Sequence, residues 1–266
     1  FDEAADLFGR VMTAADRTPA DEADARRLRA VCLAHRFDLK PAAEALRLVG
    51  LDDAGKPADP RADVPTAELR ARAVVLAGQK DRKLRAEAAK LFEQVEGREP
   101  LNPADQYQLG RLYAALNDPD KARPRLAAAV RGDGSSAIYL GEYANFLIQT
   151  GRPDEARPLV EKLRRVEPDG ARAAEATARL LKADGKPDEA VAALAKYADT
   201  PGGSKPRAVA LVERLGLDEH AEGFVRKATA EMSSPGREVA LAAYLARRGR
   251  VKEAFAKGEP LMGYQV

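Results

Sequence analysis

The chain has 266 residues, of which 45% are hydrophobic and only 5% aromatic, and it contains no tryptophan. Its 44 basic and 42 acidic residues give a formal net charge of +2, which disfavours a nucleic-acid-binding protein with a clustered basic face. The single cysteine, Cys32, excludes an intrachain disulfide, and no apolar run approaches the roughly 18 residues of a membrane span. This composition favours many close helix contacts over one aromatic core.

The N-terminal part of the chain predicts irregular helices. The opening FDEAADLFGRV, starting at Phe1, is typical of mid-helix sequence, so we expect a fragment of a longer protein, with any localisation signals outside it. Residues 21–37 have helical periodicity, and residues 40–49 are predicted to form the partner helix. Residues 50–65 are rich in Gly, Pro and Asp and predict a surface loop between repeats.

Three similar phrases follow at intervals of 34 residues: NDPDKARPRL from Asn117, GRPDEARPLV from Gly151 and GKPDEAVAAL from Gly185. Gly, and next to it Asn, accepts the left-handed conformation that ends a helix. The following proline suits the first turn of a new helix, and the acidic residues suit its positive end. Each phrase therefore predicts the end of one helix and the start of the next.

A small residue of each second helix recurs with the same period and then with steps of 31 and 33 residues, after the short connector 201–206. Because alanine lets a neighbouring helix approach closely, we expect these positions to be packed. They are Ala88, Ala122, Ala156, Ala190, Ala221 and Ala254.

Two prolines disagree with this pattern. Pro124 and Pro158 are also 34 residues apart and fall inside the predicted second helices. An interior proline typically costs about 3 kcal/mol and bends a helix. Either the helix tolerates a kink there or its first turn begins later than the phrase suggests.

A fixed period of this size is typical of helical solenoids. The unit QYQLGRLYAAL, with Leu109, Gly110 and Tyr113, resembles the tetratricopeptide repeat family, although Gln106 replaces the family's tryptophan. The resemblance implies an all-α, right-handed superhelical solenoid of antiparallel helix pairs. We expect degenerate repeats over 1–65, regular 34-residue repeats over 66–204 and degenerate repeats over 205–266, in one continuous solenoid.

No catalytic, cofactor or metal site is predicted. Cys32 and His35 lack the further ligands that zinc requires, and His220-Ala221-Glu222 lacks the companion cysteines of a zinc deaminase. The segment RGDGSS (131–136) lacks the ending of a phosphate loop and predicts an inter-repeat turn. The sequence therefore favours a non-catalytic protein–protein interaction scaffold. The alternative is a docking or regulatory arm of a larger enzyme whose catalytic domain lies outside this chain.

In the family that the chain resembles, the first helix of each repeat lines a concave groove. Carried over, this implies a ladder of donors suited to an extended, acidic peptide, with Gly141 leaving space for the ligand. The alternatives are that these are ordinary solvated residues, or that the convex face around Arg157 binds instead. Self-association through apolar ends is also expected. The groove candidates are Tyr107, Arg111, Asn145, Arg172, Glu175 and Arg179.

Overall fold

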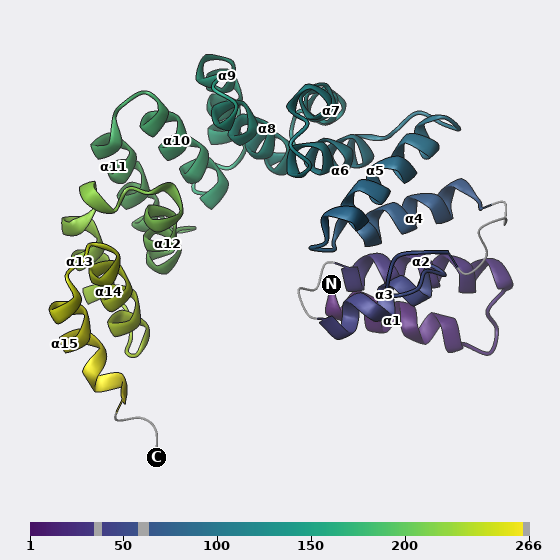
Figure 1. Ribbon diagram of the computed structural model, residues 1–266, viewed down its shortest axis with the longest axis horizontal. Helices are drawn as coiled ribbons and strands as arrows, with labels where there is room; N and C mark the ends of the chain where they lie inside the picture. Colours follow the sequence, from purple (N-terminus) through teal and green to yellow (C-terminus); the bar gives the residue numbers. More distant parts are fainter. Residues whose placement is uncertain (35–38, 58–63, 263–266) are drawn as a thin grey trace. The chain divides into compact units, whose positions relative to one another are not determined.

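The computed structural model describes residues 1–34, 39–57 and 64–262 (Figure 1). In these ranges the regular structure is helical, apart from an isolated antiparallel bridge between Leu51 and Pro57. The prediction of an all-α fold of paired helices is therefore confirmed. The chain divides into two compact units, Phe1–Asp133 and Gly134–Val266, each described below by itself.

The first unit consists of helices that pack mainly on their neighbours in sequence. The first helix packs on the second and the second on the third, the fourth packs on the fifth, and the sixth on the seventh. The described part of the predicted loop contains the Leu51–Pro57 bridge, and Leu51 is buried there. The helices are α1 (Asp2–Thr13), α2 (Pro19–Ala34), α3 (Leu39–Leu48), α4 (Thr66–Ala77), α5 (Arg82–Glu96), α6 (Pro103–Ala115) and α7 (Pro119–Gly132).

The second unit repeats the same helix pair. The helices α8 and α9, α10 and α11, and α14 and α15 pack as pairs, and α10 also packs on both α8 and α9. In the same way, α12 contacts α10 and α11, and α14 contacts α12 and α13. The elements are α8 (Ala137–Gln149), α9 (Pro153–Val166), α10 (Ala171–Ala183), α11 (Pro187–Ala198), α12 (Lys205–Leu215), the 3-10 turn η1 (Asp218–His220), α13 (Glu222–Ala230), α14 (Gly236–Arg247) and α15 (Val251–Met262).

The same turn closes the first helix of successive pairs. Each turn contains one residue in the left-handed conformation, and the next residue donates its backbone N–H to the carbonyl oxygen five positions earlier. The distance is 2.8 Å from Arg152 N to Leu147 O and 2.9 Å from Lys186 N to Leu181 O. This is the Schellman arrangement. The turns expected at the three repeated phrases are confirmed, and two more follow. The left-handed residues of these five turns are Asn117 (φ 63°), Gly151 (75°), Gly185 (74°), Gly216 (61°) and Gly249 (71°).

The predicted alanine positions are packed. Five of the six are fully buried, and Ala254 is 9% exposed. Each of Ala122, Ala156, Ala190, Ala221 and Ala254 lies five residues after a left-handed turn residue, so the shorter repeats shift turn and alanine together.

The two interior prolines lie within complete helices. Because α7 begins at Pro119 and α9 at Pro153, Pro124 and Pro158 occupy the sixth helical position, and a late helix start is ruled out. Both prolines are exposed. Water can therefore bind the carbonyl that loses its intrahelical partner, which lessens the cost of the missing N–H.

Candidate functional site

In the first unit, the candidates Tyr107 and Arg111 lie one turn apart on α6. The Arg111 guanidinium carbon is 5.5 Å from the centroid of the half-buried Tyr107 ring, while Arg111 itself is exposed. Such a cation–π contact contributes about 0.5–1 kcal/mol at an exposed site. The ring therefore holds the cation at the surface of α6.

In the second unit, Glu175 joins two arginines. Its Oε1 accepts a hydrogen bond from Arg179 Nη2 (2.8 Å), and its Oε2 accepts one from Arg214 Nη2 on α12 (2.6 Å). The Glu175 and Arg179 side chains are only 15% and 19% exposed. Sequence reasoning named Glu175 and Arg179 as groove candidates but missed Arg214, which lies 39 residues beyond Glu175.

The space expected at Gly141 is filled. A Cβ built there would lie 3.5 Å from Leu163 Cδ2 and 3.7 Å from Arg172 Cβ. These are ordinary van der Waals distances, so an alanine would fit as well, but Gly141 is buried and no open room for a ligand chain lies beside it. Arg172 lies beside it, with Nη1 3.6 Å from Glu167 Oε1.

Asn145 of α8 is partly buried. Its Oδ1 has no hydrogen-bond partner among the described residues. An unsatisfied buried acceptor typically costs about 1–3 kcal/mol, so this amide retains hydrogen-bonding capacity.

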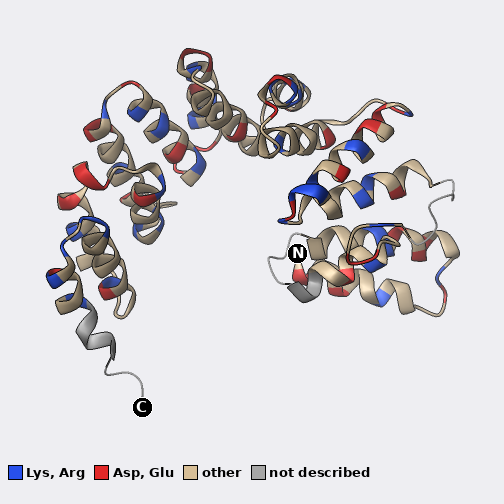
Figure 2. Ribbon diagram, in the orientation of Figure 1, with Lys and Arg blue, Asp and Glu red and all other residues tan. Residues whose placement is uncertain are grey.

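The alternative face around Arg157 is already engaged. The Arg157 guanidinium donates from Nη1 and Nη2 to both carboxylate oxygens of Asp184, at 2.8 and 2.7 Å. These bonds raise the pKa of Arg157 and lower that of Asp184. Acidic and basic residues are interspersed along the helices of each unit (Figure 2).

The titratable candidates for other chemistry are dispersed. Cys32 is buried, which raises the pKa of its thiol, and His35 lies outside the described residues. His220 Nδ1 lies 2.9 Å from Asp188 Oδ1, on an exposed surface. Within residues 1–34, 39–57 and 64–262, no group of three or more His, Cys, Asp or Glu side chains is arranged to hold a metal. The expected turn at 131–136 is present: Gly132 ends α7, and Ser136 caps α8.

The family model described as tetratricopeptide repeat matches residues 79–137, 107–163 and 144–205. Residues 79–205 are built from tetratricopeptide repeats. Proteins built from these repeats are generally non-catalytic scaffolds that bind proteins or peptides. This repeat protein therefore belongs to a class of interaction scaffolds.

Solved structures show the same fold. A tetratricopeptide repeat protein from Parabacteroides merdae superposes with a TM-score of 0.55 at 15% identity, covering 91% of this chain and 94% of its own. Yeast Tom70 superposes with a TM-score of 0.57 at 16% identity, covering 97% of this chain and 54% of Tom70. No curated protein sequence matches the chain. In the described part of this repeat protein, no helix combines the length and apolar character needed to cross a membrane.

Proposed function

We propose that the protein is a scaffold that holds an extended peptide of a partner protein on the surface of its first helices. In the second unit this first-helix surface is defined by Asn145, Glu175, Arg179 and Arg214. Its polar residues come from three successive first helices, α8, α10 and α12. Repeat arrays of this kind generally present such extended surfaces to partners.

The main support for this proposal is the cluster of Glu175, Arg179 and Arg214. Its two guanidinium groups and one carboxylate leave one formal positive charge at neutral pH. Arg214 uses one N–H for Glu175, and its side chain is 54% exposed, so further N–H groups face solvent. Guanidinium groups bind carboxylates through paired hydrogen bonds, which favours an acidic residue in the partner.

Asn145 supports an extended backbone as the ligand. A side-chain amide offers both a donor and an acceptor, as a peptide unit requires. Because Asn145 Oδ1 has no partner among the described residues, a bound peptide N–H would satisfy it after a rotation of the side chain. In the first unit, the Tyr107 ring and Arg111 offer a flat apolar contact beside a cation.

The test begins with peptides selected against the whole chain from a random display library, with affinity measured by calorimetry. The variant Asn145→Ala, Arg179→Ala, Arg214→Ala should weaken binding at least about tenfold, because charge-assisted and amide hydrogen bonds are lost together.

The matched control removes three exposed side chains elsewhere, as Arg131→Ala, Lys162→Ala, Lys252→Ala. It should change the affinity less than about twofold, because rim charges far from a site act weakly. Unchanged affinity in the first variant, with its helical circular dichroism intact, would refute the proposed surface.

A further inference from the structure

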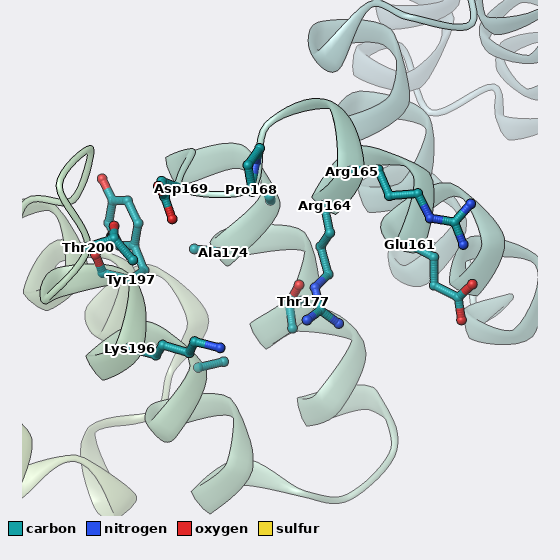
Figure 3. Close-up of a pocket in the computed structure, with 12 residues that line it drawn as sticks. Glu161, Arg164, Arg165, Pro168, Asp169, Ala174, Thr177, Lys196, Tyr197 and Thr200 are labelled. Atoms are coloured by element: carbon teal, nitrogen blue, oxygen red, sulfur yellow. Dashed lines mark hydrogen bonds between the residues drawn. The ribbon is translucent and has the colours of Figure 1, made fainter.

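A second surface lies on the other side of α10. A groove of about 610 Å³ runs between the second helices α9 and α11, and α10 forms its floor (Figure 3). Ala173, Ala174 and Thr177 form that floor. Since successive helical residues turn by about 100°, Ala173 and Thr177 each lie roughly 160° around α10 from Glu175. The groove is therefore separate from the first-helix surface.

Cationic side chains from both walls meet at this groove. Figure 3 shows Arg164 of α9 extending beside Thr177, and Lys196 of α11 extending from the opposite wall. At the other end, Asp169 lies near Tyr197 and Thr200. Small floor residues between two cations leave room for a side chain that carries a carboxylate.

The ion pairing of these two cations matters for the charge of the groove. Among the described residues, neither Arg164 nor Lys196 has a carboxylate oxygen within 4.0 Å of its nitrogens. By contrast, the nearby Arg157, Arg172 and Lys186 each form an ion pair. The groove lining carries the cations Arg164, Arg165 and Lys196 and the carboxylates Glu161 and Asp169, which leaves one formal positive charge. Arg164 and Lys196 supply two cations from separate helices, and neither has an ion-pair partner among the described residues.

We propose that the groove between α9 and α11 binds an acidic segment of a partner protein. A carboxylate of that segment lies between Arg164 and Lys196 and accepts hydrogen bonds from both. The segment's aliphatic carbons pack on Ala173 and Ala174, and its backbone N–H groups donate to Asp169. The charge complementarity selects an acidic segment, because a basic or apolar one would leave both cations unpaired.

The probe is an amidated nonapeptide of alternating glutamate and alanine, labelled with fluorescein at its N-terminus and titrated with the full chain by anisotropy. The variant Arg164→Gln, Lys196→Gln should weaken binding at least about tenfold, because both charged donors to the carboxylate are lost. The control Arg131→Gln, Lys162→Gln removes the same charge elsewhere and should change affinity less than about twofold.

A second variant keeps both cations. Thr177→Glu places a carboxylate on the floor, where it competes with the ligand for them, so binding should again fall at least about tenfold. Circular dichroism checks that each variant retains its helices. A glutamine version of the nonapeptide should not bind.

Three outcomes would overturn the proposal. In the first, the wild-type protein does not bind the acidic probe saturably. In the second, the groove variant and its charge control lose affinity equally. In the third, Arg179→Ala, Arg214→Ala abolishes binding while the groove variants bind normally. That last result would place the acidic segment on the first-helix surface, so failure of the groove is distinguishable from failure of the proposed function.

Discussion

The turn glycines give the sharpest stability prediction. Gly185 has φ of 74°, and no heavy atom lies within 4 Å of the place where a Cβ would sit. Gly185→Ala therefore tests backbone conformation with no steric clash. A left-handed residue with a Cβ costs about 1–2 kcal/mol, and the lower entropy of the unfolded alanine chain returns about 0.4–1 kcal/mol. We expect a net loss of about 1 kcal/mol.

Gly223 supplies the matched control. It lies in α13, its φ is outside the left-handed region, and a Cβ there also meets nothing within 4 Å. Gly223→Ala should therefore stabilise the protein by about 0.4–1 kcal/mol. The same substitution, in equally open space, should thus lower the free energy of unfolding at Gly185 and raise it at Gly223.

The measurement is urea unfolding followed by far-UV circular dichroism, with hydrogen exchange of the amides in α10 and α11 as a local readout. The local readout is needed because repeat arrays need not unfold in one step. If Gly185→Ala is neutral or stabilising, or if both variants change stability in the same direction, the conformational argument is wrong.

Three further predictions concern packing, charge and association. Ala156 is fully buried, so Ala156→Phe should overpack its helix contact and lower the free energy of unfolding by about 1–3 kcal/mol, and an unchanged thermal melt would contradict this. The hydrogen bond from Arg125 lowers the pKa of Glu96, so the stability from this pair is present above the unfolded carboxyl pKa and lost as pH falls through the folded one. Wild type should therefore lose more stability than Glu96→Gln between neutral and acidic pH, and equal losses would count against the pair. Phe1 and Phe255 are 71% and 67% exposed, so light scattering should show self-association that Phe1→Ser, Phe255→Ser reduces, whereas a wild-type monomer at every concentration would exclude it.

The turns and packed alanines could be predicted from sequence because their constraints are local. Only glycine or asparagine occupies the left-handed position readily, so Asn117, Gly151 and Gly185 marked the helix ends directly. A residue five positions later then had to be small. The proposed division of the chain at residues 65 and 204 has no comparable local marker and stays a prediction.

The polar partners could not be predicted in the same way. A long arginine side chain reaches several carboxylates, and the sequence does not say which one it binds, so the pairing of Glu175 with Arg214 on α12 was missed. Periodicity placed Gly141 on the correct helix but could not show that it is buried there, next to Leu163 and Arg172. The groove between α9 and α11 was missed because small residues such as Ala173 and Thr177 look like ordinary packing positions.

The central claim, that partners bind the first-helix surface, is tested most directly by site-specific photo-crosslinking. The photoreactive residue p-benzoylphenylalanine would replace Arg172, which is 48% exposed and lies one turn before Glu175 on α10, or Arg157, which is 46% exposed on the second helix α9. The library-selected peptide would then be irradiated with each protein. We expect a crosslink from position 172 and none from position 157, and unlabelled peptide should compete with that crosslink. A crosslink from position 157 alone would contradict the account.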